Sequence, residues 1–278
     1  MRIRAGILLG LLLIGCVPAK PPVVERHTPS VPVAPAAVTE AAPTAVKPDT
    51  PANAPRMVVR DVDGITFEGV SFDIRNFRML VVDQPGGPGS RFTDAQAAGV
   101  SRHAIAAVNA GFFTPEGTPL GLVVCGGKSV GAWNSASSLG SGVWYQSNVG
   151  DSHITRRETL GRSSALTMRE LIQAGPMLVE NGRMVCGLDA AKTSARTAIL
   201  CDGNSRWWIG HASPCSLADF AKAIATAEPA GWKAASALNL DGGRSADLWI
   251  SDTVTGGPLT RRTPWNRPVR NFLVLVPR

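Results

Sequence analysis

Four short blocks that combine polar residues with glycine stand at the ends of predicted strands. In chain order they are Asn109-Ala110-Gly111-Phe112-Phe113, Gln173-Ala174-Gly175-Pro176, Arg196-Thr197-Ala198 and Asn239-Leu240-Asp241-Gly242-Gly243-Arg244-Ser245-Ala246. The last block places one carboxylate, two adjacent glycines and one serine in a turn. Adjacent glycines let the backbone approach a ligand closely and present N–H groups to an anion. The block therefore indicates a site for a negatively charged ligand, although Asp-Gly-Gly is also typical of an ordinary hairpin turn.

The motifs of several common hydrolases are missing. The sequence contains no Ser-x-x-Lys and no His-Glu-x-x-His, and the histidines of the C-terminal domain, His103, His153 and His211, are scattered along it. A serine hydrolase of a common type needs a base beside its nucleophile, and a zinc enzyme needs clustered ligands. Neither class is expected here.

The order of the four blocks, with a serine-initiated helix before the last one, resembles the phosphodiester glycosidase family. The resemblance extends from about Ile105 to Val274, and Asn-Leu-Asp-Gly-Gly is its most specific part. It implies release of a sugar from a phosphodiester link. It also implies a site whose catalytic residues are Asp241, Arg196 and Asn109, and whose substrate-binding residues are Gly111, Phe112, Gly242, Gly243, Arg244 and Ser245.

Two positions depart from the family pattern. Arg244 stands where a small residue or proline is commoner, and Asp247 stands where threonine or another small polar residue is usual. Each site position also has a purely structural interpretation. Phe112 belongs to the core in that interpretation, Arg196 to a cross-strand pair, and Asn109 to a turn.

The implied reaction needs fewer carboxylates than ordinary glycoside hydrolysis, which uses two. A phosphate monoester leaves as an anion without prior protonation, so the main requirement is to hold negative charge. The guanidinium of Arg196 suits that task, and the Gly242-Gly243 amides and the Ser245 hydroxyl add donors. Asp241 then stabilises the oxocarbenium-like centre or acts as the base for water. Asp247 is the nearby candidate for a second acid.

No motif indicates a cofactor, but Asn109 and Asp241 remain possible oxygen ligands for a divalent metal. Two other functions fit the same residues. One is a non-catalytic envelope module that binds an anionic glycan, and the other is a purely structural lipoprotein. The structural function would be favoured if Asn109, Arg196 and Asp241 lay far apart.

The elements that must position these blocks are mostly strands. Alternating apolar and polar residues predict strands at 65–68, 71–74, 79–83, 104–108, 122–125, 142–145, 237–238 and 272–276, and hairpins over 177–185 and 197–209. Capping patterns predict short helices beginning at Thr93 and Thr167 and a longer one from Leu217 to about Ala227. We therefore expect a single α+β domain over 56–278, with a mostly antiparallel or mixed sheet and few helices.

The N-terminus predicts export and lipidation. Two arginines precede an apolar run that is too short to span a bilayer, and the run ends in Leu13-Ile14-Gly15-Cys16, which resembles a bacterial lipobox. Residues 1–15 are then a signal peptide and Cys16 carries the lipid that attaches the protein to the membrane. Val17 implies sorting to the outer membrane, facing the periplasm, in a Gram-negative cell. An ordinary signal peptide with a chance cysteine is the alternative.

Residues 17–55 contain ten prolines and no aromatic residue, which predicts an extended tether. The domain that follows carries 23 basic and 18 acidic residues, a balance that suits an anionic glycan. No run of Lys or Arg indicates nucleic acid. The four cysteines of the domain, Cys125, Cys186, Cys201 and Cys215, favour disulfides in an oxidising envelope, with the pairing open and free buried thiols as the alternative.

Overall fold

The structure is a computed structural model that describes residues 54–263 and 265–278. The predicted signal peptide, the lipidation site Cys16 and residues 17–53 of the tether lie outside the described residues. Within the described part, no helix has both the length and the apolar character needed to cross a membrane.

Three antiparallel sheets make up the described domain, which confirms the predicted α+β class. The first sheet has the order β1 (Arg56–Val62), β2 (Ile65–Asp73), β13 (Arg206–Cys215), β12 (Ser194–Cys201), β14 (Ser236–Asn239), β10 (Met177–Glu180) and β11 (Arg183–Met184). The second has the order β16 (Leu259–Arg262), β15 (Asp247–Ile250), β4 (Ala106–Asn109), β17 (Asn271–Pro277) and β3 (Phe77–Asp83). The third has the order β6 (Lys128–Val130), β5 (Val123–Cys125), β9 (Glu170–Ala174), β7 (Gly142–Gln146) and β8 (Ser152–Arg156).

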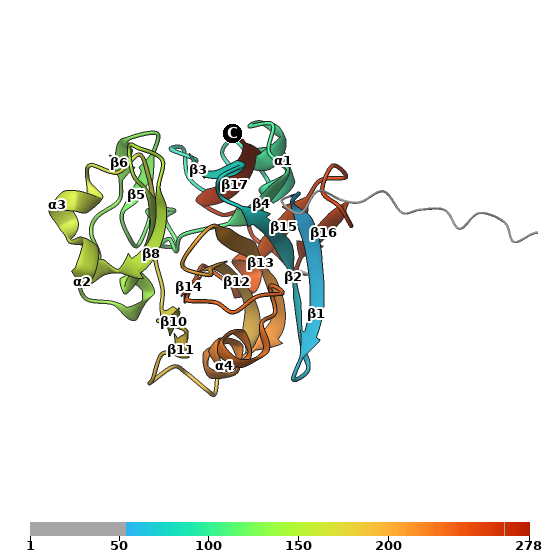
Figure 1. The fold of residues 1–278 in the computed structure, drawn as a ribbon. Coiled ribbons are helices and arrows are strands. Elements are labelled where there is room, and N and C mark those ends of the chain that lie inside the picture. The colour runs from blue at the N-terminus through green and yellow to red at the C-terminus, as the bar shows by residue number, and fades with distance from the viewer. Residues whose placement is uncertain (1–53, 264) are drawn as a thin grey trace, which may run out of the picture. The chain divides into compact units, whose positions relative to one another are not determined.

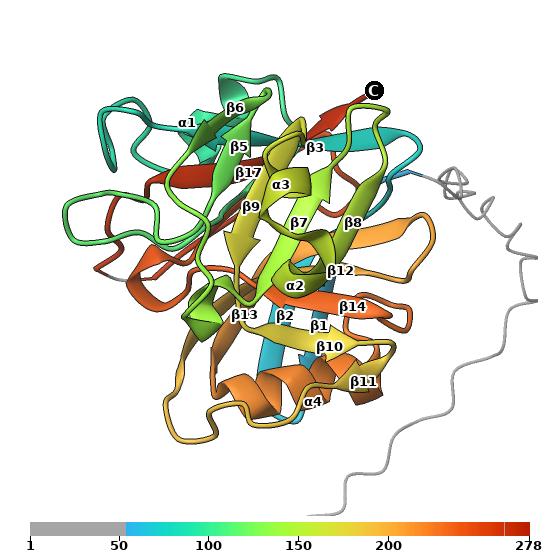
Figure 2. The same ribbon diagram turned by 90° about the vertical axis from the view of Figure 1, so that its left-hand side faces the viewer.

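The helices are short and lie on the outside of the sheets. They are α1 (Ala95–Val100), α2 (Arg157–Leu160), α3 (Arg162–Ala165) and α4 (Leu217–Ala227), with 3₁₀ turns η1 (Ser138–Gly140) and η2 (Gly243–Ser245). Figure 1 shows α4 at the bottom beside the first sheet, and Figure 2 shows α2 and α3 in front of the third sheet. The helices therefore cover sheet faces and leave the region where the sheets meet to strand ends and loops.

One apolar core joins the three sheets. It includes Val70 from β2, Trp144 from β7, Ile199 from β12 and Leu273 from β17, all at most 1% exposed. Burial of this kind contributes roughly 1.5–3 kcal/mol for each large side chain. The core therefore fixes the positions of the sheets relative to one another, and the site blocks stand at their edges.

Local sequence signals placed the hairpin and the longest helix correctly. Asn181 and Gly182 have φ of 51° and 72°, the left-handed pair that a tight turn between β10 and β11 requires. In α4, the Ser216 hydroxyl accepts a hydrogen bond from the Asp219 amide at 3.0 Å, so the helix begins where predicted.

The predicted helix from Thr167 to Gly175 is wrong. Residues 170–174 form β9, the central strand of the third sheet, and all five are buried. The Thr167 hydroxyl donates to the Ser164 carbonyl at 2.8 Å and so completes the end of α3 rather than starting a new helix. The helix predicted at Thr93 is present, but Asp94 caps it by accepting from the Ala97 amide at 2.8 Å. At residues 170–174, burial in the third sheet outweighed the local capping pattern.

The four cysteines of the domain are free in the structure, contrary to the expected disulfides. Cys201 and Cys215 are buried, as in the alternative of free thiols, while Cys125 is half-buried and Cys186 is exposed. Burial raises the pKa of the Cys215 thiol to about 11, which makes it an unreactive apolar side chain at neutral pH.

We predict that Phe220→Ala will destabilise the domain by about 3–5 kcal/mol, because this fully buried ring stacks on Phe67 of β2 with 5.5 Å between centroids. Urea unfolding of the two proteins measures the difference. Lys222→Ala changes an exposed residue of the same helix and should alter stability by at most about 0.5 kcal/mol. Equal stability of wild type and Phe220→Ala would contradict the packing of α4 on the first sheet.

Candidate active site

The four predicted blocks meet where the first and second sheets adjoin, and the Gln173-Ala174-Gly175-Pro176 block joins the others through Asn239, whose Nδ2 and amide donate to the Gly175 and Pro176 carbonyls at 2.9 and 3.1 Å. The chain leaves the first sheet at Asn239, passes through residues 240–246 and enters the second sheet at Asp247. The Leu240 amide donates to the Thr197 carbonyl at 2.9 Å, and the Asp241 amide donates to the Ala110 carbonyl at 2.9 Å. Figure 1 shows the strands concerned, β4, β12, β14 and β15, in the middle of the domain. The Asp-Gly-Gly block is therefore a link between two sheets and not a hairpin turn.

The Asn109 side chain fastens these segments together. Its Nδ2 donates to the Asp241 carbonyl, and its Oδ1 accepts from the Thr197 hydroxyl at 2.9 Å and the Asp247 amide at 3.0 Å. Asn109 is fully buried. Since both lone pairs of Oδ1 are in use, this oxygen is not available as a metal ligand. Among the described residues, no three His, Cys, Asp or Glu side chains gather in a way that could hold a metal ion.

Asp241 is a buried carboxyl group with one oxygen uncommitted. Its Oδ1 accepts from the Gly242 amide at 2.9 Å, and its Oδ2 has no hydrogen-bond partner among the described residues. Burial raises its pKa to about 6, while the nearby Ser245 side chain and Arg267 partly offset the rise by favouring the ionised form. A raised pKa together with an unmet buried oxygen is typical of a functional carboxyl.

Arg267 supplies a cation to this site that the sequence analysis missed. Its Nε donates to the Ser245 hydroxyl oxygen at 3.2 Å, and its guanidinium carbon lies 4.7 Å from the centre of the Phe113 ring. Its backbone amide donates to the Arg244 carbonyl at 2.9 Å. The only local signal is an arginine beside a proline in the loop before the last strand, which is too common to indicate a site.

Arg196 lies in the same region, but its guanidinium is directed elsewhere. The Thr197 side chain reaches Asn109, so its neighbour Arg196 projects from the other face of β12. There Nε and Nη2 donate to the Cys215 carbonyl at 2.9 and 2.8 Å, and Nη2 also donates to the Lys192 carbonyl at 2.8 Å. The structure thus brings the backbone of Arg196 to the site while its charged group holds the end of β13.

The glycines of the predicted site stand where the backbone is close to other groups. A Cβ on Gly242 would lie 2.6 Å from the Ala195 carbonyl oxygen, and Gly243 has φ of 61°. The Gly111 amide donates to Asn271 Oδ1 at 2.7 Å, and Asn271 Nδ2 is buried without a partner among the described residues. Asn271 is a second polar residue at the site that the sequence analysis did not identify.

The remaining predicted positions are either packed in the interior or exposed at the surface. Phe112 is half-buried and packs against the central core, and Ser245 is fully buried beside Asp241. Arg244 is exposed, and its Nε donates to the Trp265 carbonyl at 3.0 Å. Asp247, expected as a second acid, has its Oδ2 bonded to the Ala95 amide at 2.9 Å and lying 3.4 Å from Arg262 Nε.

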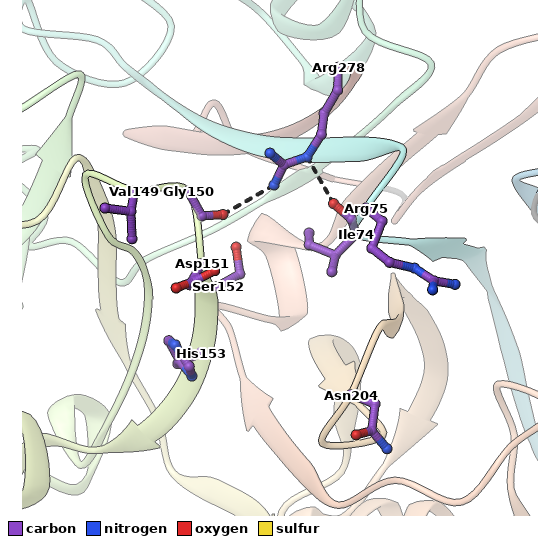
Figure 3. Close-up of a pocket in the computed structure, with 9 residues that line it drawn as sticks. All are labelled: Ile74, Arg75, Val149, Gly150, Asp151, Ser152, His153, Asn204 and Arg278. Atoms are coloured by element: carbon purple, nitrogen blue, oxygen red, sulfur yellow. Dashed lines mark hydrogen bonds between the residues drawn. The ribbon is translucent and has the colours of Figure 1, made fainter.

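Two hollows of similar size, about 460 and 470 Å³, are lined by none of the predicted site residues. One, of about 460 Å³, opens between β8 and the β2–β3 turn, and the Arg278 side chain spans its upper end by hydrogen bonds to Ile74 and Gly150 (Figure 3). Its lining includes none of the predicted site residues. The buried carboxyl and its neighbours, rather than the size of a cavity, therefore locate the candidate site.

The chain also contains one Gly-x-Ser-x-Gly stretch, at residues 127–131. A nucleophile elbow needs the serine on a sharp turn between a strand and a helix. Ser129 instead lies in β6, at the edge of the third sheet, and is exposed. This stretch therefore does not provide a catalytic serine of that type.

Comparison with solved structures shows the same fold in three proteins of low sequence identity. The catalytic domain of zebrafish N-acetylglucosamine-1-phosphodiester alpha-N-acetylglucosaminidase, auto-inhibited by its pro-peptide, is 18% identical with a TM-score of 0.57, over 84% of this chain and 86% of that one. A hypothetical protein from Synechocystis is 18% identical with a TM-score of 0.54, over 81% and 61%. A putative exported protein from Burkholderia pseudomallei is 14% identical with a TM-score of 0.53, over 77% and 75%.

The family comparison agrees with the fold. No curated protein matches the sequence. Residues 102–276 match the phosphodiester glycosidase family, and this range holds every predicted site residue of the domain together with Arg267 and Asn271. Because the match covers well over half of the chain, the protein belongs to the phosphodiester glycosidase family.

Proposed function

We propose that this protein hydrolyses the bond between the anomeric carbon of a sugar and an oxygen of a phosphodiester. The observation that carries the proposal is Asp241, a buried carboxyl with an uncommitted oxygen beside Ser245 and Arg267. The zebrafish enzyme of similar fold is described as acting on N-acetylglucosamine-1-phosphodiester, which supports the same class of substrate here.

The proposed reaction needs one base and one anion-binding group. Water attacks the anomeric carbon, the bond from that carbon to the phosphate oxygen breaks, and a phosphate monoester leaves with the electron pair. Asp241 takes the proton from water, and its ionised form also stabilises positive charge at the anomeric carbon. Arg267 and the Ser245 hydroxyl that it contacts supply the donors that hold the leaving phosphate in this proposal.

We propose positioning roles for Asn109 and Arg196. Asn109 holds the Asp241 carbonyl and two neighbouring segments, so it fixes the place of the carboxyl. Arg196 fixes the end of β13 against β12 through the Cys215 carbonyl. A phosphate-bearing ligand would then meet Arg267 as its cation.

We further propose that the substrate belongs to the cell envelope. The lipobox-like Cys16, the proline-rich tether and the basic balance of the domain support a lipid-anchored enzyme that works on anionic glycans outside the cytoplasm. In a Gram-negative cell the outer membrane, facing the periplasm, is the proposed location.

The raised pKa of Asp241 implies a pH dependence of the proposed reaction. Asp241 must be ionised to act, and its pKa is about 6, so kcat/KM for a sugar-1-phosphodiester should rise about tenfold per pH unit below pH 6 and level off above it. Asp241→Asn should lower kcat by about 10²–10⁴-fold at pH 7.5. Steady-state assays from pH 4.5 to 8 measure both effects.

Asp247→Asn is the matched control, because burial also raises the pKa of Asp247 to about 6. The fall of kcat/KM below pH 6 should persist in this variant. If this fall disappears with Asp247→Asn, Asp247 is the titrating group. If the wild type binds the phosphodiester but releases no monoester, the protein is a non-catalytic glycan-binding module and not a hydrolase.

Arg267 and Arg196 have different proposed roles, so their alanine variants should behave differently. Arg267→Ala should lower kcat/KM by about 10²–10³-fold, because the cation beside Ser245 is lost. The same variant should change stability little, because Arg267 is exposed. Arg196→Ala should destabilise the fold by about 1–3 kcal/mol, since the buried Cys215 carbonyl loses its donors. Kinetics and urea unfolding of both variants test this. The opposite pattern would assign the phosphate to Arg196.

A further inference from the structure

The hollow drawn in Figure 3 is one part of a longer groove. A second hollow, of about 210 Å³, adjoins it, and Val149, Gly150 and Arg278 line both. Arg278 directly follows β17, whose first residue, Asn271, lies at the candidate active site. The rise of an extended strand separates these two residues by roughly 20 Å. The groove is therefore separate from the site around Asp241.

Arginines dominate the charge of this groove. Arg75 and Arg278 line the larger hollow, and Arg78, Arg169 and Arg278 line the smaller one. Asp151 is the only acidic residue among the described residues of either lining. The guanidinium fork matches the geometry of phosphate oxygens, and a hollow lined by one sign of charge concentrates ions of the other sign. The lining therefore suits an anionic ligand.

Three of the four guanidinium groups are available to such a ligand. Arg78 and Arg169 are exposed and form no ion pair within the described part of the chain. Arg278 donates from Nε and Nη2 to backbone carbonyls, so its Nη1 has no partner among the described residues. Arg75, in contrast, is paired with Asp73 and adds little net charge. Most of the positive charge of the groove is thus not neutralised by the protein.

The exposure of these arginines indicates how many charges the ligand carries. Arg78 and Arg169 lie in solvent, where a single ion pair contributes little to binding because the dielectric constant is high. A ligand with one phosphate would therefore bind weakly. One chain that places several phosphates along both hollows makes the later contacts intramolecular, and the weak contacts then act together. The groove fits a chain of phosphates better than a single ion.

Uncharged polar groups lie beside the charges. Asn204 and Ser152 line the larger hollow, and the Ser152 hydroxyl is buried without a partner among the described residues. Figure 3 shows both side chains at the hollow, with Arg278 at its upper end. Amide and hydroxyl groups can donate to and accept from the hydroxyl groups of a polyol or sugar. The lining therefore suits phosphates that are joined by hydroxylated units.

A membrane surface also presents phosphates, but the groove fits it less well. Attachment to a lipid surface uses several apolar side chains that enter the bilayer together with the basic ones. Val149 is 84% exposed between the two hollows, but it is the only large apolar side chain exposed in either described lining. Its neighbour Asp151 carries a negative charge on the same loop.

We propose that this groove is a second binding site, which holds a polymer whose units are joined through phosphodiesters. The polymer lies along the two hollows, with Arg278 between them and Arg78 and Arg169 at the smaller one. Binding here does not require Asp241, so the site operates whether or not the protein hydrolyses its ligand. In an enzyme, it would keep the catalytic domain on an anionic polymer between successive reactions.

Poly(glycerol phosphate) tests the site, because it repeats the phosphodiester but has no anomeric carbon to be attacked. In calorimetry with the full chain at low salt, Arg78→Gln/Arg169→Gln should weaken binding of this polymer about tenfold. Arg183→Gln/Lys222→Gln is the matched control, because it also removes two exposed charges, but from β11 and α4. The control should weaken binding less than about twofold. Equal affinities of the two double variants would overturn the proposal.

Two substitutions of Val149 test whether the groove is continuous. Val149→Glu places a carboxylate where the two hollows adjoin and should weaken binding about tenfold. Val149→Gln has a side chain of the same length without the charge and should bind as the wild type does. Equal binding by these two variants would overturn a site that extends over both hollows.

Glycerol-3-phosphate and phosphatidylglycerol vesicles carry the same phosphate singly and on a lipid surface. Both should bind at least about tenfold more weakly than the polymer. Glycerol-3-phosphate that binds as tightly as the polymer would overturn the multivalent site. Vesicles that bind more tightly, and lose this binding in Arg78→Gln/Arg169→Gln, would replace the polymer with a membrane.

Turnover of a small sugar-1-phosphodiester separates the groove from the proposed function. It should be unchanged in Arg78→Gln/Arg169→Gln, because these residues lie away from Asp241. If the polymer binds but the ester is not hydrolysed, the groove is retained and the proposed hydrolysis is wrong. If the ester is hydrolysed but the polymer does not bind, the hydrolysis is retained and the groove is wrong.

Discussion

The side-chain amide of Asn109 joins segments that are up to 138 residues apart in the sequence. Its three hydrogen bonds reach the turn after β14, the middle of β12 and the start of β15, and so connect the first sheet to the second. Each partner is buried, and an unmet buried polar group costs about 1–3 kcal/mol. This requirement keeps the two sheets in one relative position, which is what a site assembled from both of them needs.

Burial in the same part of the structure determines the pKa of Asp241. The carboxyl sits close to the Asn109 bonds, where burial disfavours its charge and raises its pKa to about 6. Gly242 and the nearby Ser245 and Arg267 compensate only in part. The protein therefore maintains a carboxyl group whose ionised form is destabilised by burial. Such an arrangement is typical of sites where function, rather than stability, selected the residue.

The second carboxyl shows why burial alone does not identify a catalytic group. Asp247 has a similarly raised pKa and also has one oxygen, Oδ1, without a hydrogen-bond partner among the described residues, but its Oδ2 accepts from the Ala95 amide at the start of α1 and lies 3.4 Å from Arg262 Nε. Its backbone amide is one of the Asn109 partners. Asp247 thus helps to hold α1 on the second sheet, while the charge of Arg267, from the loop before β17, acts on Asp241 without a direct bond.

Sequence alone determined several of the local elements and the family. The Asn181-Gly182 turn, the Ser216 cap and the blocks around Asn109 and Asp241 depend on neighbouring residues, and such short-range chemistry is visible in a sequence. Tertiary structure decided which side chains meet. Arg196 faces away from Asp241 because strand residues alternate between faces, and Arg267 arrives from a loop that only sheet packing brings near. Residues 170–174 became a strand for the same reason, since burial between neighbouring strands outweighs a local capping pattern.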